Sequence, residues 1–197
     1  MPIFGGKPTC PYCKRVLETA PARKTRCPHC GRYIVVRAGR LVTEDEAAIT
    51  DWLSRATDFG VSRRDFDRHR DELSKQFGAS ASVNDTMWRI LNVLIGRASG
   101  AATLRSVYLE MAALAAREGK DPKPYLAEGF KLELEEHRRQ GVRTVRVRNC
   151  NDNFVCPACQ ALYDKTWRIE AALSEMPIPT LCEAPSGCRC GYSPAMR

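Results

Sequence analysis

The chain has 197 residues, of which 44% are hydrophobic and 27% are charged, with a formal net charge of +8. These values are typical of a globular protein of one or two domains, and no stretch approaches the roughly 20 consecutive apolar residues that a membrane-spanning helix needs. The opening residues, MPIFGGKPTC, lack the apolar core of a signal peptide. We therefore expect a cytoplasmic protein without a membrane partner.

Positive charge is concentrated at the N-terminus. Residues 1–40 hold nine Lys and Arg against the single acid Glu18, so their net charge equals the +8 of the whole chain, and residues 41–197 balance. Any attraction to a polyanion should therefore centre on residues 1–40.

The ten cysteines fall into two groups, four in residues 10–30 and six in residues 150–190. In a reducing compartment such clusters bind metal more often than they form disulfides. The first group reads Cys10-Pro-Tyr-Cys13 and Cys27-Pro-His-Cys30, a C-x2-C-x13-C-x2-C pattern. Two residues between thiolates let backbone N–H groups turn toward both sulfurs, and two such knuckles complete a tetrahedron around Zn²⁺. Gly31 suits the positive φ that often follows a knuckle.

Residues 8–37 resemble the rubredoxin-like zinc ribbons, so we predict a four-cysteine ribbon over residues 1–41, with a short strand at Ile34–Val36. An alternative is redox chemistry, because Cys-Pro-Tyr-Cys is also the active-site tetrapeptide of glutaredoxin-like enzymes. Those enzymes place it between a strand and a helix, whereas here few residues precede Cys10 and a matching second motif follows. The pattern therefore favours zinc.

The tip of the ribbon carries Arg23, Lys24 and Arg26, which we predict to contact nucleic acid, since phosphate binding depends on dense Lys and Arg. Tyr12 and Tyr33 either pack against the knuckles or stack on bases; packing is the interpretation we favour.

Helical patterns follow over residues 42–140. Thr43 and Glu46 have the spacing of a capping box, which predicts a helix that ends near Gly60. Ser62 begins a second helix that ends at Gly78, and His69 on it is expected on a solvated face. Further helices are predicted at three segments: an all-round apolar, buried one at 87–95, an amphipathic one closing at Gly119, and one from Asp121–Pro122 to Gln140.

After Gly141 the pattern changes to short elements. VRTVRV alternates as a strand, residues 166–169 suggest a second strand, 170–175 a helical turn, and 177–179 an extended segment. Several arginines lie at the end of the helix predicted to reach Gln140 and in the strand that follows it. We interpret them as solvated side chains on a helix end and on an edge strand. This basic run consists of Arg138, Arg139, Arg143, Arg146 and Arg148. We predict a cysteine-rich zinc-binding lobe over residues 141–197.

In this lobe Cys156-Pro-Ala-Cys159 forms a third knuckle. Five sulfurs compete for the four positions around the metal, so three pairs could complete the site with this knuckle. These pairs are Cys182 with Cys188, Cys182 with Cys190, and Cys188 with Cys190. Cys150 stands apart and is interpreted as a free thiol.

The run from Cys156 to Pro194 resembles the C-terminal motif of phage Mu-type head-morphogenesis (minor head) proteins. The positions that match are Cys156, Cys159, Leu162, Asp164, Lys165, Pro177, Pro179, Cys188, Arg189, Cys190 and Pro194. The family's usual His three residues before Cys-Arg-Cys is replaced by Pro185, and Cys182 stands nearby as a shifted substitute. The resemblance implies phage or prophage ancestry, and it does not extend to the N-terminal ribbon.

The expected fold is mainly α: a central helical bundle flanked by the zinc ribbon and a small zinc-bound α+β lobe. We expect two Zn²⁺ ions and no enzymatic activity, since the three histidines lie in unrelated settings and all-thiolate sites are usually structural. Two functions remain possible. In the first, the basic ribbon contacts nucleic acid. In the second, the chain is a structural or adaptor protein whose zinc lobes dock onto a protein partner. Neither requires a small-molecule substrate.

Overall fold

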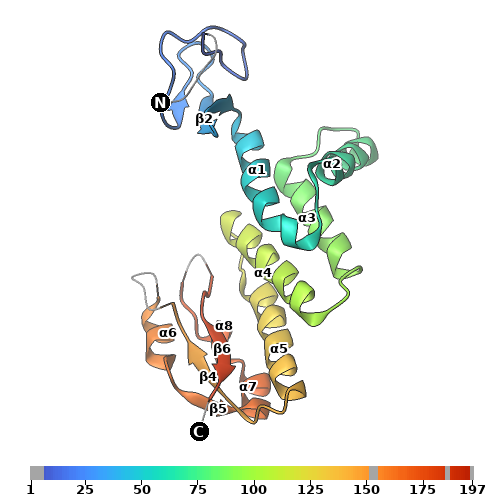
Figure 1. Cartoon of the computed structure of the whole chain (residues 1–197), viewed down its shortest axis with the longest axis vertical. Coiled ribbons are helices and arrows are strands. Elements are labelled where there is room, and N and C mark those ends of the chain that lie inside the picture. The colour runs from blue at the N-terminus through green and yellow to red at the C-terminus, as the bar shows by residue number, and fades with distance from the viewer. Residues whose placement is uncertain (1–6, 151–154, 185–186, 196–197) are drawn as a thin grey trace. The chain divides into compact units, whose positions relative to one another are not determined.

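The computed structural model describes residues 7–150, 155–184 and 187–195. The chain forms two compact units, residues 1–83 and 84–197, and is mainly helical with two small antiparallel sheets (Figure 1). Within the described residues, no helix is both long and apolar enough to cross a membrane.

The first unit begins with a three-stranded antiparallel sheet in the order β1-β2-β3. Its strands are β1 (Thr25–Arg26), β2 (Tyr33–Arg37) and β3 (Arg40–Val42). Ala38 and Gly39 between β2 and β3 both have positive φ, 47° and 74°, as a two-residue turn that matches the twist of a hairpin requires. Ile34 on β2 is fully buried against Cys10, Leu17 and Cys27, so the core of the ribbon is built around its cysteines.

Two helices complete the first unit, each capped where the sequence predicts. The Thr43 hydroxyl accepts a hydrogen bond from the Glu46 N–H at 3.1 Å and begins α1 (Glu44–Ala56). A short 3-10 turn, η1 (Thr57–Phe59), leads to Gly60 at φ 70°. Ser62 and Asp65 form a capping box at the start of α2 (Arg63–Phe77).

The expectation for His69 is wrong. Its side chain is buried, with 8% exposure, and Nδ1 lies 3.5 Å from Glu72 Oε2. His69 follows Phe66 by three residues and precedes Leu73 by four, so it shares their buried face of α2.

The second unit contains three long helices, α3 (Val83–Ile95), which begins at the boundary, α4 (Ala101–Arg117) and α5 (Lys123–Arg139). The helix predicted to be buried, α3, is buried on one face: Met87 and Leu91 are buried, whereas Asn92 is exposed. A Cβ at Gly129 would meet the Leu109 side chain at 3.4 Å, so glycine there permits the close approach of α4 and α5.

The C-terminal sheet is antiparallel in the order β5-β4-β6. Its strands are β4 (Thr144–Arg148), β5 (Thr166–Arg168) and β6 (Gly191–Pro194), with three short helices between them, α6 (Pro157–Leu162), α7 (Ile169–Glu175) and α8 (Pro177–Thr180). The strand predicted at an edge, β4, is therefore the central one, because the last described residues return to pair with it. The segment predicted to be extended is assigned to α8, although Ile178 inside it has extended dihedral angles.

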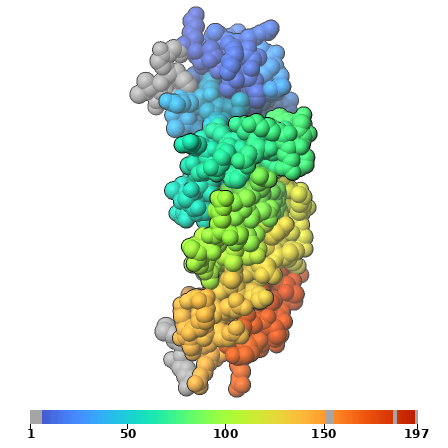
Figure 2. All heavy atoms as spheres, turned by 90° about the vertical axis from the view of Figure 1, so that its right-hand side faces the viewer, coloured from blue at the N-terminus to red at the C-terminus, as the bar shows by residue number. Residues whose placement is uncertain are grey.

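The C-terminal elements share one hydrophobic core with α5. Phe130 and Leu134 of the helix pack in the same buried cluster as Val145, Ile169 and Tyr192. In the space-filling view the red C-terminal residues lie against the yellow surface of α5 (Figure 2). The short, proline-rich segments thus obtain from α5 the apolar surface that they lack themselves.

Candidate metal centres and basic surface

The two N-terminal knuckles have the same backbone geometry. The N–H of Lys14 donates to the Cys10 carbonyl at 3.0 Å, and the N–H of Gly31 donates to the Cys27 carbonyl at 2.9 Å. Lys14 and Gly31 both have positive φ, 61° and 72°. The prediction for Gly31 is confirmed, and Lys14 adopts the equivalent conformation without being glycine.

These knuckles bring the four predicted sulfurs of Cys10, Cys13, Cys27 and Cys30 within 4.8 Å of one another. The Sγ atoms of Cys10 and Cys30 are 3.8 Å apart, and those of Cys13 and Cys27 are 3.9 Å apart. A tetrahedron with Zn–S bonds of about 2.3 Å has edges of about 3.8 Å. The four side chains therefore fit a zinc ion, and the group could hold a metal.

The surroundings shift the pKa values of two of these thiols, Cys27 and Cys30, in opposite directions. Burial opposes ionisation of Cys27, but backbone N–H groups of Cys30 and His29 lower its pKa to about 6. At Cys30 the N–H of Arg32 favours the thiolate, whereas burial and the adjacent thiols raise the pKa to about 11. Adjacent thiolates repel one another, so ionisation of all four requires a compensating cation.

In the C-terminal cluster Cys156 caps α6, and its Sγ accepts hydrogen bonds from the N–H groups of Cys159 and Glu183, each at 3.4 Å. The Sγ atoms of Cys156 and Cys182 are 3.9 Å apart, and those of Cys159 and Cys188 are 3.7 Å apart. Each knuckle cysteine thus has a sulfur neighbour from the later part of the chain, as in the ribbon.

The five candidate sulfurs form two overlapping groups. Cys156, Cys159 and Cys182 make one, and Cys159, Cys188 and Cys190 make the other. Burial raises the pKa of Cys159, and the neighbouring Cys190 thiol raises that of Cys188. Because Cys182 shares the first group with both Cys156 and Cys159, it is the third candidate ligand. Cys188 and Cys190 then compete for the fourth ligand position.

Cys150 belongs to neither group among the described residues. Its side chain is exposed, and its thiol donates to the Arg189 carbonyl at 3.3 Å.

The basic residues of the ribbon surround Tyr33, which is 36% exposed. Lys24 Nζ lies 4.5 Å and the Arg26 guanidinium 4.8 Å from the centre of its ring. Arg26 is paired directly opposite Tyr33 in the β1–β2 register, which explains the contact. The sequence named both residues without linking them, because the pairing register is decided by folding. Arg23 is exposed, and among the described residues it has no ion-pair partner.

Tyr12, by contrast, packs against the knuckles, as the sequence analysis favours. Its ring contacts the buried cysteine cluster, and its hydroxyl accepts a hydrogen bond from the Glu44 N–H at 2.9 Å. Arg32, which the sequence analysis did not single out, lies 5.1 Å from the centre of its ring.

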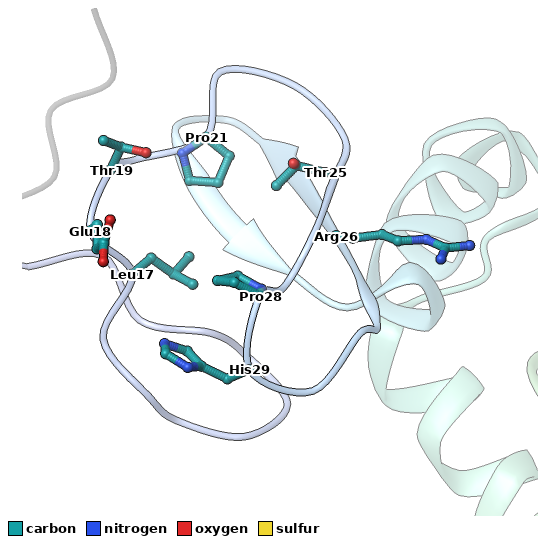
Figure 3. A pocket seen from close by; sticks show the side chains of 8 residues that line it. All are labelled: Leu17, Glu18, Thr19, Pro21, Thr25, Arg26, Pro28 and His29. Atoms are coloured by element: carbon teal, nitrogen blue, oxygen red, sulfur yellow. The ribbon is translucent and has the colours of Figure 1, made fainter.

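A small pocket of about 280 Å³ lies on the ribbon between Leu17, Pro21 and Pro28. Figure 3 shows that Arg26 extends away from the other residues that line the pocket. Glu18 also lines the pocket, so it is not a strongly basic site, and the cationic surface is at Tyr33.

Comparison with family models, with curated proteins and with solved structures finds no match for this chain.

Proposed function

We propose that this chain is a non-enzymatic zinc protein that contacts nucleic acid through the basic face of its N-terminal ribbon. The observation that supports this most is that Lys24 and Arg26 both lie against the ring of Tyr33, while Arg23, which precedes Lys24 in the chain, is exposed.

Zinc is proposed for both clusters on the chemistry of their donors. Thiolates are soft ligands that suit Zn²⁺, and the sulfur separations of 3.7–3.9 Å match the edges of its tetrahedron. Four thiolates leave no position for a water or substrate, so both ions are assigned a structural role. The proposal places the protein in a reducing compartment such as the cytoplasm, where clustered thiols bind metal.

Nucleic acid is proposed because the cations of the ribbon are dense and held in place. Residues 1–40 carry the full net charge of +8. The Tyr33 ring limits the freedom of the Arg26 side chain, so less entropy is lost when that guanidinium binds a phosphate. Because cations lie against its ring, Tyr33 is assigned to positioning them rather than to stacking on bases.

Anisotropy titrations of short DNA duplexes of unrelated sequence test this proposal. Arg23→Ala with Arg26→Ala should weaken binding to all duplexes alike and make the salt slope shallower by about two ion equivalents. Arg15→Ala with Arg40→Ala removes the same charge from two other exposed positions of the ribbon and should weaken binding less. Wild-type protein that binds neither DNA nor RNA at low salt would end the proposal.

A second candidate is an adaptor of phage or prophage origin that docks onto a protein partner. It is supported by the motif from Cys156 to Pro194 and by two large apolar side chains exposed in that segment, Tyr163 at 42% and Leu181 at 52%. Stable association with a protein that survives high salt, together with no affinity for nucleic acid, would favour this function over the first.

A further inference from the structure

A second basic surface lies in the C-terminal unit, at a cavity of about 600 Å³ near the end of α5. Three arginines line it, Arg138, Arg143 and Arg168, together with one acid, Glu170. Arg168 lies outside the basic run recognised in the sequence, so the grouping arises from the fold.

Two local structures bring the arginines together. After Arg138 the chain reverses through Gly141, at φ 80°, where the N–H of Gly141 donates to the Arg138 carbonyl and that of Val142 to the His137 carbonyl, each at 3.0 Å. This is a Schellman motif, which ends the helix and directs the chain into β4. Arg143 thereby lies one residue before the strand.

The β4–β5 pairing then adds Arg168. Thr144 pairs with Arg168, and the N–H of Ile169 donates to the Arg143 carbonyl at 3.0 Å. Arg143 and Arg168 therefore lie at the same end of the β4–β5 ladder, and both line the cavity near the end of α5.

The three arginines of the cavity differ from Arg139 and Arg146 in their ion pairing. Arg139 pairs with Glu136 at 2.5 Å, and Arg146 pairs with Asp164 at 3.3 Å. In the part of the chain that the structure describes, Arg138, Arg143 and Arg168 are exposed and have no carboxylate partner. Arg148, the remaining member of the basic run, is likewise exposed, so what sets Arg138, Arg143 and Arg168 apart is that they line one cavity.

We propose that this cavity binds the phosphate backbone of a nucleic acid, as a second contact surface independent of the ribbon. Guanidinium groups bind phosphate oxygens through paired N–H donors, and three of them around one concavity can contact successive phosphates. Protein interfaces usually have an apolar centre depleted of charge, whereas four of the eight residues that line this cavity are charged and three of those are arginines. The inference shares its ligand class with the proposed function but stands on different residues.

The two ends of the β4–β5 ladder supply a matched comparison. Arg143→Ala with Arg168→Ala removes two charges at the cavity, and Arg148→Ala with Lys165→Ala removes two exposed charges at the opposite end. Full-length, metal-loaded protein is titrated with short labelled DNA, as duplex and as single strand. The cavity pair should weaken binding severalfold and reduce the salt slope by about two ion equivalents, and the opposite pair should have a smaller effect.

Glu170→Gln tests whether charge governs the affinity of the cavity. Glu170 is the one carboxylate among the described lining residues, so its loss should tighten DNA binding by about two- to fivefold at low salt. A merely structural role for Glu170 does not produce tighter binding. Arg138→Ala, on the helix end, serves as the second cavity variant if the Arg168 substitution disturbs folding, as judged by metal content and circular dichroism.

The same titrations with Arg23→Ala and Arg26→Ala separate this inference from the proposed function. If the ribbon variant still binds DNA, and this remaining binding is lost when Arg143 and Arg168 are also replaced, the proposed cavity site is supported. If the ribbon variant abolishes binding, or if both ladder pairs weaken it equally, the cavity site is wrong and the ribbon proposal stands. If only the cavity pair matters, the ribbon proposal fails. Binding of tripolyphosphate without binding of DNA would overturn the assignment to nucleic acid.

Discussion

Lys24 Nζ lies 2.6 Å from Glu44 Oε1, so a cation at the tip of the ribbon is paired with the first residue of α1. The hydrogen bond that Lys24 donates to the Glu44 carboxylate raises the pKa of Lys24. Both side chains are about half exposed, and such surface pairs contribute little to stability. The pair instead reduces the positive charge that the ribbon presents, and Lys24 is less available to phosphates than Arg23 or Arg26.

Glu44→Gln should therefore tighten binding of the ribbon to DNA by about two- to fivefold at low salt, with almost no change in stability. Asp45→Asn is a matched control, because it removes the same charge from the adjacent residue, whose partner is Arg70. The gain should disappear when Lys24 is also replaced by Ala. An equal gain from both carboxyl variants would show that general charge, and not this ion pair, is responsible.

Reduced protein should contain two zinc ions per chain. Cys13→Ser and Cys159→Ser should each release one, because each removes a ligand from a different cluster. Hydrogen exchange should then increase only in the affected segment, residues 8–42 for Cys13 and 155–195 for Cys159, since segments with small cores depend on a cross-link. Cys150→Ser is the control and should change neither property. Elemental analysis that finds one metal or none would contradict this prediction.

The fourth ligand of the C-terminal cluster is predicted to be Cys188, whose sulfur lies 3.7 Å from that of Cys159. Cys190→Ser should keep its zinc during a chelator challenge. Cys188→Ser should lose zinc faster but not completely, because Cys190 lies beside the same sulfur, and the double variant should lose it. If the two single variants behave in the opposite order, Cys190 is the ligand.

Tyr192 joins β6 to α8. Its hydroxyl donates to the Ile178 carbonyl at 3.2 Å and accepts from the Ile178 N–H at 3.3 Å, and both residues are buried. Tyr192→Phe leaves those backbone groups without a partner and should lower the free energy of unfolding by about 1–3 kcal/mol, measured by urea denaturation. Tyr163→Phe, at a 42% exposed position, should cost much less. A similar loss in both variants would show that the Tyr192 hydroxyl contributes nothing specific.

The sequence by itself determined the local features of this protein. The spacing of the ribbon cysteines predicted their convergence, because a knuckle is fixed by the residues within it and by the conformation of Gly31. Thr43, Ser62 and Gly60 predicted helix ends correctly, since a cap acts on the backbone of its own turn. The five later cysteines also converge as expected, although their long and irregular spacing left the partners of Cys156 and Cys159 open.

Only the tertiary structure decided which distant residues meet. The β1–β2 register places Arg26 against Tyr33. The pairing of β4 with β5 and β6 makes β4 the central strand and brings Arg168 to the cavity that Arg143 also lines. Strand register depends on which faces are buried and not on residue type at the pairing position. His69 was misplaced for a different reason, because its charged neighbours in the sequence were given more weight than its helical spacing from Phe66 and Leu73, which places it on their buried face. Charge can be counted along a chain, but folding decides which cations gain a carboxylate partner. Lys24 has one in Glu44, whereas Arg143 has none among the residues that the structure describes.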